Sequence, residues 1–219
     1  MAAPQGLGTP IARPRELSYT KDGQTLLLQR VSTAKMPTAF GEFVVTAYQE
    51  EGATHLALVA GEVCGKERVL VRVHSECLTG DALGSLRCDC GEQLHDAMRR
   101  ISTTGCGIIL YLRQEGRGIG LANKVRAYHL QDHGFDTVAA NRHLGFPADG
   151  RDFQVAALIL KDLEVASVEV LTNNPRKIRS LRAHGVRVES RLALQSTPNV
   201  HNRAYLEAKR DQMGHELTL

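Results

Sequence analysis

The sequence predicts a single α/β domain in which a mixed sheet is flanked by helices and the N-terminal half is rich in strands. Short runs of β-forming residues, separated by glycines and polar turns, occur at residues 26–28, 43–47, 55–60 and 69–74. In the second half, apolar runs typical of buried strands alternate with segments of helical periodicity, which is the pattern of α/β proteins. The length of 219 residues is enough for one well-packed domain.

The first 24 residues are expected to form a flexible N-terminal leader. This segment carries Pro4, Pro10 and Pro14 and shows little apolar periodicity, which is typical of chain that does not fold. No internal repeat and no linker divides the remaining chain. The domain is therefore expected to span residues 25–219.

A helix is expected to open at the segment 88–90. Asp89 and Glu92 have the spacing of a helix-capping pair, and one apolar face follows at Leu94, Ala97, Met98 and Ile101. Cys90 then lies at the helix N-terminus, where the positive end of the helix dipole favours a thiolate.

A buried strand, a glycine-rich loop and a second helix follow in that order. Residues 107–112 are a continuous apolar run of strand length. Beyond the glycines, Leu121, Val125 and Tyr128 share one face of a helix that Gly134 would end.

Two more helices and a strand complete the second half. Asp152 can cap a helix that runs through Leu163, and residues 168–171 read as another strand. Pro175 suits the first position of a helix that ends before Gly185.

Charge and composition narrow the class of ligand. The net charge of +3 and the pI near 8.6 favour an anionic ligand but fall far short of a dedicated nucleic-acid binder. Aromatic residues make up 5% of the chain and tryptophan is absent, so stacking platforms for single-stranded nucleic acid are scarce. A nucleotide substrate fits better than a nucleic-acid partner.

Cysteine usage and hydropathy bear on the compartment. The five cysteines are an odd number in a chain without an apolar signal segment, which favours a reducing compartment, and we expect the cytoplasm. Apolar runs such as residues 56–60 and 156–160 are far shorter than the ~20 residues that cross a bilayer, so no membrane span is expected.

Three cysteines fall within fourteen residues and predict a metal site. Cys77, Cys88 and Cys90 supply three ligands for a tetrahedral ion, and a catalytic zinc site keeps its fourth position for water or substrate. Two alternatives stay open at this point. A structural site could be completed by His74 or His95, or the thiols could lie close together without binding metal.

Two junctions between a strand and a helix have the features of phosphate sites. The loop with Gly116, Gly118 and Gly120 exposes backbone N–H groups, and Arg113 and Arg117 add charged donors. It is neither a Walker loop nor a dinucleotide fingerprint, and a simple tight turn is the alternative. The junction from Thr172 to Lys177 combines a hydroxyl, a helix N-terminus and a lysine in the same way.

Asp149 and Arg151 lie two residues apart in a loop bounded by proline and glycine. Such loops often carry reactive groups, although a surface turn followed by a helix cap is the alternative. Tyr128 is by default a core tyrosine unless its hydroxyl faces a polar cavity.

Taken together, these segments resemble GTP cyclohydrolase II, the entry enzyme of riboflavin synthesis. The resemblance rests on the Cys77 segment, residues 87–91, 113–120, 149–152 and 172–175, and it runs in register from about residue 29 to 214. Residues 25–219 would then be the GTP cyclohydrolase II catalytic domain, without room for the second, dihydroxybutanone phosphate synthase domain of bifunctional relatives.

The resemblance implies a zinc-dependent hydrolase. Cys77, Cys88 and Cys90 would bind one Zn2+, and a water that the ion activates would attack C8 of the guanine ring, which leaves as formate. The products would be 2,5-diamino-6-(5-phosphoribosylamino)pyrimidin-4(3H)-one, formate and pyrophosphate. Mg2+ is expected with the GTP triphosphate. A homodimer is implied, with no nucleic acid and no membrane as partner.

The resemblance also assigns catalytic roles. Arg151 would be the nucleophile at the α-phosphorus with Asp149 as its proton acceptor, and Tyr128 would lie near C8. Arginine is normally protonated, so electrostatic stabilisation of the α-phosphate is a physically easier role for Arg151.

GTP contacts are implied for twelve residues. Glu76 and Gln93 suit the guanine edge, and Arg117 and Lys177 suit phosphates. The full set is Arg72, Val73, His74, Ser75, Glu76, Gln93, Glu115, Gly116, Arg117, Thr137, Thr172 and Lys177. The rival functions are a diverged enzyme that stops at a formylamino intermediate, and a zinc-stabilised nucleotide sensor or RNA-binding module without turnover.

Overall fold

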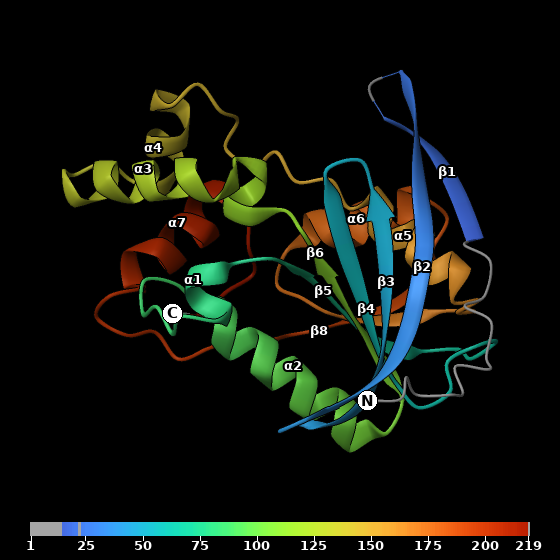
Figure 1. Ribbon diagram of the computed structural model, residues 1–219. Helices are drawn as coiled ribbons and strands as arrows, with labels where there is room; N and C mark the ends of the chain where they lie inside the picture. Colours follow the sequence, from blue (N-terminus) through green and yellow to red (C-terminus); the bar gives the residue numbers. More distant parts are fainter. Residues whose placement is uncertain (1–14, 22, 219) are drawn as a thin grey trace, which may run out of the picture.

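The computed structural model describes residues 15–21 and 23–218, which form one eight-stranded mixed sheet with helices on both faces (Figure 1). The strand order is β1-β2-β3-β4-β6-β5-β7-β8. The strands are β1 (Arg15–Lys21), β2 (Gln24–Thr38), β3 (Gly41–Glu50), β4 (Ala53–Ala60), β5 (Val69–Ser75), β6 (Gly107–Leu112), β7 (Val168–Leu171) and β8 (Val188–Leu192).

The sheet changes character at β6. Strands β1 to β4 are joined by short turns and pair antiparallel, and β4 also pairs antiparallel with β6. Strands β5, β6, β7 and β8 pair parallel. Parallel strands need crossover connections, which helices supply. The predicted α/β class and the strand-rich N-terminal half are confirmed, because five of the eight strands come before residue 76.

Seven helices and one short 3-10 helix lie between or after these strands in the described part of the chain. They are α1 (Leu78–Asp81), α2 (Cys90–Thr104), η1 (Glu115–Gly118), α3 (Gly120–Asp132), α4 (Thr137–His143), α5 (Gln154–Asp162), α6 (Pro175–Ala183) and α7 (Arg203–Met213). None of the described helices combines the length and the apolar character that crossing a bilayer requires.

Two apolar layers hold the helices to the sheet. Ala97, Met98 and Ile101 of α2 pack with sheet residues such as Ile109 on one face. Helices α5 and α6 pack on a second buried cluster that includes Val71. Helices α3, α4 and α7 gather beyond the sheet, to one side of it (Figure 1).

The N-terminal strand corrects one expectation. The predicted flexible leader covers residues 1–24, but residues 15–21 form β1, which pairs along its whole length with β2, so the expectation is wrong there. Arg15 also reaches the buried carboxylate of Asp162 on α5, with Nε and Oδ1 3.2 Å apart. Residues 1–14 lie outside the described residues.

Helix starts were predicted better than the side chains that cap them. Helix α2 begins at Cys90 as expected, but the Asp89 carboxylate does not cap it and binds Lys209 and Gln93 instead. Asp152 does accept the backbone N–H of Gln154 at the start of α5. Pro175 is the first residue of α6, as predicted.

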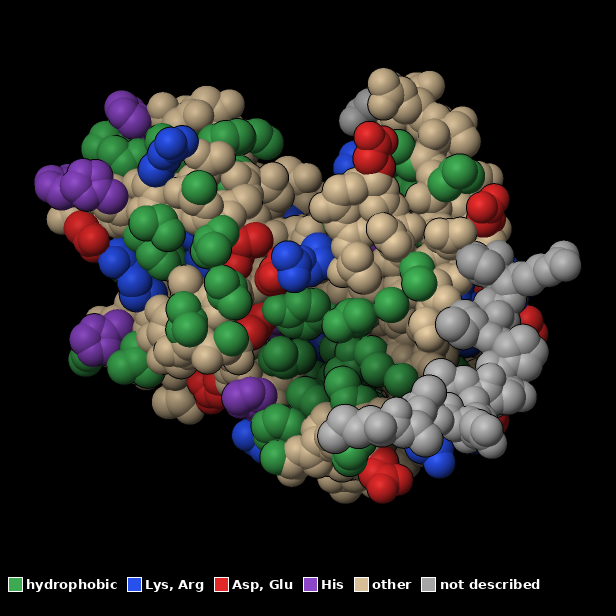
Figure 2. Space-filling view, viewed as in Figure 1, with side chains coloured by type: hydrophobic (Ala, Val, Ile, Leu, Met, Phe, Trp, Pro, Cys, Tyr) green, Lys and Arg blue, Asp and Glu red, His purple; other side chains and the backbone are tan. Residues whose placement is uncertain are grey.

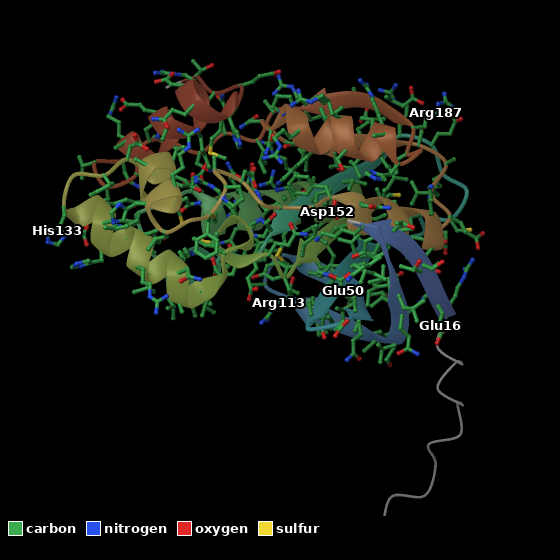
Figure 3. All side chains as sticks on the ribbon, turned by 90° about the horizontal axis from the view of Figure 1, so that it is seen from above. Glu16, Glu50, Arg113, His133, Asp152 and Arg187 are labelled. Carbon is green, nitrogen blue, oxygen red and sulfur yellow. The ribbon has the colours of Figure 1, made fainter. Side chains whose placement is uncertain are left out.

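The predicted apolar face of α3 is only partly buried. Leu121 and Val125 are 41% and 55% exposed, because α3 lies beyond the sheet edge rather than on its face. His133 marks the far end of this helix, at the opposite side of the molecule from Glu16 and Arg187 (Figure 3). Helices α1, α4 and α7 and strand β8 were not predicted.

Candidate active site

The site forms where the parallel strands end. Chain segments leave the carboxyl ends of β5, β6 and β7 at the same edge of the sheet, and residues 75–77, 113–119 and 172–174 therefore come together there. Two neighbouring cavities open at this edge, and five residues line both of them: Ser75, Cys90, Arg117, Arg151 and Tyr205.

The three predicted cysteines meet in the first cavity. Their Sγ atoms all lie within 4.8 Å of one another, and those of Cys77 and Cys88 are 3.6 Å apart. Three thiolates on a tetrahedral zinc ion, with bonds of ~2.3 Å, would be separated by ~3.8 Å. Gly80 makes room for them, because a Cβ at this position would lie 2.8 Å from the Cys88 Sγ. The geometry and the donor set fit zinc.

No histidine or carboxylate completes this group in the described part of the chain. His74 points its Nε2 at Asp81, with the closer carboxylate oxygen at 3.0 Å, and His95 stacks on Phe40. The four-ligand alternative raised by the sequence is therefore not supported. A three-ligand group leaves one coordination position for water or substrate, as catalytic zinc sites do.

Asp81 holds the first cysteine in place. Its Oδ2 accepts the backbone N–H of Cys77 at 2.9 Å and the hydroxyl of Tyr111 at 2.8 Å, while His74 binds the same carboxylate. The Asp81 carboxylate thus joins β5, β6 and the cysteine loop. Such outer partners orient metal ligands and support their affinity.

Lys124 supplies a buried positive charge beside the thiols. Its Nζ is 3.1 Å from the Cys77 Sγ and 2.8 Å from the Glu115 Oε1. Hydrogen bonds from the other two thiols and the charge of Lys124 hold the pKa of Cys77 well below its usual value. The same bond to Cys77 raises the pKa of Cys88 to about 11, and the pKa of Cys90 is also raised.

Tyr128 faces the cysteine cavity rather than the core. Its hydroxyl lies 3.4 Å from the Thr79 Oγ1, which is itself 3.7 Å from the Cys77 Sγ. Burial raises the pKa of Tyr128, so the hydroxyl stays protonated and can donate a hydrogen bond. The hydroxyl of Tyr128 therefore faces a cavity, which the sequence analysis required before this tyrosine could have a role beyond the core.

The glycine-rich loop is built for close packing. Gly116 and Arg117 both have positive φ values, 62° and 63°, and a Cβ on Gly116 would lie 3.0 Å from Ile119 and 3.2 Å from Lys124. This winding brings Glu115 inward, where its carboxylate accepts the backbone N–H groups of Leu78 and Gly116 as well as Lys124. The loop thus also holds the cysteine segment.

The second cavity is strongly cationic. The positive side chains that line it are Arg72, Arg117, Arg151, Lys177 and Lys209. Burial lowers the pKa of Arg72 to about 10 and moves the pKa of Lys177 well below its usual value, with Arg72 and Arg151 adding repulsion to Lys177. Buried cations that repel one another indicate a site for an anion.

Unsatisfied polar atoms point to the same cavity. Eight buried side-chain nitrogen and oxygen atoms in the described chain have no hydrogen-bond partner. Six of them belong to residues that line the second cavity: Arg72, His74, Ser75, Arg117, Asn174 and His215. Buried polar groups are normally paired with protein, water or ligand, so these atoms are available to a polar ligand.

Asp149 and Arg151 form a two-point ion pair. The Asp149 Oδ1 accepts the Arg151 Nε and Oδ2 accepts Nη2, each at 2.8 Å, and Arg176 lies 2.6 Å from Oδ2. Burial opposes both charges, yet the hydrogen bonds between the two groups lower the pKa of Asp149 and raise the pKa of Arg151. Arg151, which lines both cavities, is therefore held protonated.

The structure distributes the expected GTP contacts over both cavities. Glu76, Glu115, Gly116 and Thr137 line the first only, Arg72, His74, Gln93, Thr172 and Lys177 the second only, and Ser75 and Arg117 both. The side chain of Val73 lies in the core, and its carbonyl accepts Lys177. Gln93 binds Arg72 and Asp89 with the two ends of its amide, and its contact with the guanine edge stays a prediction.

Among the residues of the site that sequence reasoning missed are Asp81, Lys124, Tyr205, Lys209 and His215. For Lys124 a signal existed, because it lies one helical turn before Tyr128. For the three residues after position 200 there was none, since Tyr205 and Lys209 come from a helix that the sequence did not predict and His215 from the turn that follows it.

A third, open hollow adjoins the first cavity. It runs between the start of α3 and the turn that follows β3, with Glu50, Arg113 and Asp152 among its residues. Figure 2 shows it as the notch between the helical lobe and the N-terminal strands, and Figure 3 labels the three residues. Arg113 pairs with Glu76, with Nε and Oε2 3.0 Å apart, and so limits this side of the first cavity.

Comparison with known proteins agrees with this site. The family model described as GTP cyclohydrolase II matches residues 29–193. The GTP cyclohydrolase-2 of Aeromonas hydrophila is 54% identical over 187 residues, which cover 84% of this chain and 95% of that protein. The riboflavin biosynthesis protein RibBA of Chlorobium phaeovibrioides is 47% identical over 220 residues, covering 100% of this chain but 54% of that protein.

The chain thus spans about half the length of its RibBA relatives. Among solved structures, RibBX, a two domain 3,4-dihydroxy-2-butanone 4-phosphate synthase from A. baumannii, gives a TM-score of 0.45 at 24% identity, covering 76% of this chain and 40% of that one. With the family match over most of the chain and the cysteine trio at its centre, the chain belongs to the GTP cyclohydrolase II family.

Proposed function

We propose that this protein is a GTP cyclohydrolase II that catalyses the first step of riboflavin biosynthesis. It would convert GTP to 2,5-diamino-6-(5-phosphoribosylamino)pyrimidin-4(3H)-one, formate and pyrophosphate. The single observation that carries the proposal is the pair of cavities that share a wall: a three-thiol group lies in one and an excess of buried cations in the other. A nucleoside triphosphate needs both, because its base and its phosphate chain react separately.

Cys77, Cys88 and Cys90 would hold one Zn2+, for which their spacing is suited. When bound, zinc supplies a water of lowered pKa and a Lewis acid for hydrolysis at C8 of the guanine. The protein's own contribution is orientation. Tyr128 offers a protonated hydroxyl in the same cavity, where it can donate to the nitrogen or oxygen atoms of the opening ring.

Arg151 would act on the phosphate chain as an electrostatic stabiliser. Its side chain lines both cavities, so it lies where the α-phosphate would join the nucleoside to the phosphates. The paired Asp149 holds the guanidinium in one orientation and keeps it charged. A protonated guanidinium is a poor nucleophile but stabilises the charge that builds on phosphoryl oxygens.

Further parts of the proposal rest on the family resemblance. Mg2+ would accompany the triphosphate and share its charge. Residues 25–219 would form the catalytic domain, with β1 paired onto its edge, and the protein would act as a homodimer. Its free thiols suit a reducing compartment, so we place it in the cytoplasm, without nucleic acid or membrane as partner.

The decisive experiment incubates the purified, zinc-loaded protein with GTP and Mg2+. Formate and pyrophosphate are followed separately, and the nucleotide product is identified by mass. Equal yields of the two with the diamino product are expected. Pyrophosphate without formate would indicate the diverged enzyme, and a folded, GTP-binding protein that forms neither product would indicate the sensor.

A further inference from the structure

The last helix and the turn after it lie beyond the residues that the family model matches, yet they complete the site. The match ends at residue 193, whereas α7 begins at Arg203. Tyr205 lines both cavities, and Lys209 and His215 line the cationic one. The C-terminal segment therefore closes a wall that the matched residues leave open.

This segment is tied firmly to the cavity. The Lys209 Nζ binds the Asp89 Oδ1 at 2.5 Å, next to the cysteine pair that opens α2. Beyond α7, Gly214 turns the chain with a φ of 65°, and the N–H of Glu216 donates to the Asn173 carbonyl at 2.9 Å. Because Asn173 itself lines the cavity, the turn is anchored at the rim.

His215 is the residue of this turn that faces the cavity without a partner. Its Nε2 is buried and makes no hydrogen bond to the described residues. Arg72 Nε, Arg117 Nη2 and Asn174 Nδ2, in the same cavity, are also buried and unpaired. A buried donor without a partner is unfavourable, so a ligand that accepts from several of these groups would be bound favourably.

The charges around His215 define the ligand. Burial, together with the cations Lys209, Arg151, Lys177 and Arg117, lowers the pKa of His215 to about 2. The imidazole is neutral in the free protein and still carries one N–H donor. A polyanion with many acceptor oxygens satisfies both the excess of cations and the unpaired donors.

We propose that His215 Nε2 donates a hydrogen bond to the phosphate chain of the bound nucleotide, so that the C-terminal turn makes the site selective for a triphosphate. This inference rests on the proposed function and names a specificity residue for it. The recognised chemistry is a linear polyphosphate, and the turn contributes a donor that an isolated cluster of lysines and arginines lacks.

The test uses inorganic tripolyphosphate, which has the chain of the substrate without the nucleoside. Its binding to the zinc-loaded full chain is measured by titration calorimetry for the wild type, His215→Ala and His215→Gln. A hydrogen bond to a charged group contributes about 1.5–3 kcal/mol, so His215→Ala is expected to weaken binding about 10-fold or more. His215→Gln keeps an N–H donor and is expected to recover part of the affinity.

His201→Ala is the matched control, because His201 is exposed and precedes the same helix. It should bind tripolyphosphate like the wild type. The thermal midpoints without ligand should agree among the four proteins, which separates a contact from a merely structural role. Equal affinity of the wild type and His215→Ala would overturn the inference.

Turnover gives an independent readout. With GTP, His215→Ala should raise KM for formate release more than it lowers kcat, since formate forms at the other cavity. A larger loss of kcat than of apparent affinity would contradict a phosphate contact. If the wild type released no formate from GTP, the proposed function would fail, while the tripolyphosphate titration would still decide the role of His215.

Discussion

The two cavities differ in what the protein leaves unsatisfied. Around the cysteine cavity, Lys124 pairs with Glu115, Asp81 accepts the backbone N–H of Cys77, and the three sulfur atoms form a group that suits a metal ion. In the cationic cavity, several buried donors have no partner. The first is arranged for a cation held by soft ligands and the second for an anion held by many donors.

The wall between the cavities couples these two chemistries. Arg151 and Arg117 belong to both. Under the proposed function, the nucleotide would place its base in one cavity and its phosphates in the other. The comparison shows that unpaired buried groups identify the kind of ligand more directly than the shape of a cavity does. It also predicts that the two reactions can be separated by mutation.

The largest effect is expected from Cys88→Ser. Removal of one of the three sulfur ligands should prevent zinc binding and slow formate release by a factor of about 10³ or more. Pyrophosphate release should persist. Both products are measured in one assay with GTP and Mg2+. Loss of both activities in a folded, GTP-binding variant would show that the cavities do not act separately.

Cys64→Ser is the control for this variant, since Cys64 is an exposed thiol outside the trio. It should retain zinc and both activities.

Arg151→Ala should affect the other reaction, the release of pyrophosphate. Loss of a charged donor to the phosphoryl group should slow pyrophosphate release by about 10²–10³. Arg151→Lys keeps the charge but not the two-point pairing with Asp149, and should recover part of the rate. Pyrophosphate release is followed under single-turnover conditions.

A second measurement on the wild type shows whether Arg151 acts as an electrostatic stabiliser or as a nucleophile. A nucleophilic arginine would carry a guanylyl group during turnover, which intact-protein mass spectrometry would detect after acid quenching. We expect no such adduct, because the Asp149 carboxylate keeps Arg151 protonated.

Lys124→Met should weaken metal binding without unfolding the chain. Lys124 contacts a cysteine ligand and also neutralises Glu115, and loss of such outer partners typically costs 10–100-fold in metal affinity. Zinc affinity is measured by competition with a chromophoric chelator. An affinity equal to that of the wild type would show that the lysine is a packing residue; Lys35→Met, at an exposed position of β2, serves as the control.

The smallest effect is expected from Asp136→Ala. Asp136 caps α4 by accepting the N–H groups of Val138 and Ala139, both at 2.8 Å, and loss of such a cap costs about 1 kcal/mol of unfolding free energy. Because α4 carries Thr137 and Asn141 of the cysteine cavity, tripolyphosphate binding in the other cavity should not change. Urea denaturation measures the free energy of unfolding, and titration calorimetry measures the affinity for tripolyphosphate.

This cap also has a defined pH dependence. The backbone N–H groups lower the pKa of Asp136 below its usual 3.8, so its stabilisation is present above that pH and is lost as the pH falls through the lowered pKa. The difference between the wild type and Asp136→Ala should thus shrink below about pH 3.8. Asp136→Asn keeps the acceptor without the charge and should show a weaker dependence on pH.

Much of the fold could be predicted because its signals are local. The apolar run at 107–112 is strand β6, and Pro175 opens α6 as proline does elsewhere. Strand β1 escaped prediction since its stability comes from pairing with β2 and from an ion pair with Asp162, which is distant in sequence. The spacing of Leu121 and Val125 correctly predicted a helix. The spacing alone does not show whether other parts of the protein bury the apolar face of that helix, and both side chains are exposed.

The sequence by itself determined the cysteine trio and the family. Cys77, Cys88 and Cys90 are close along the chain, and their chemistry admits few uses, so spacing alone was informative. Only the tertiary structure decided that Lys124 contacts a thiol, that Gln93 serves Arg72, and that His215 turns into the cationic cavity. These roles depend on contacts between distant segments, because burial and unpaired polar atoms arise only when the chain is packed.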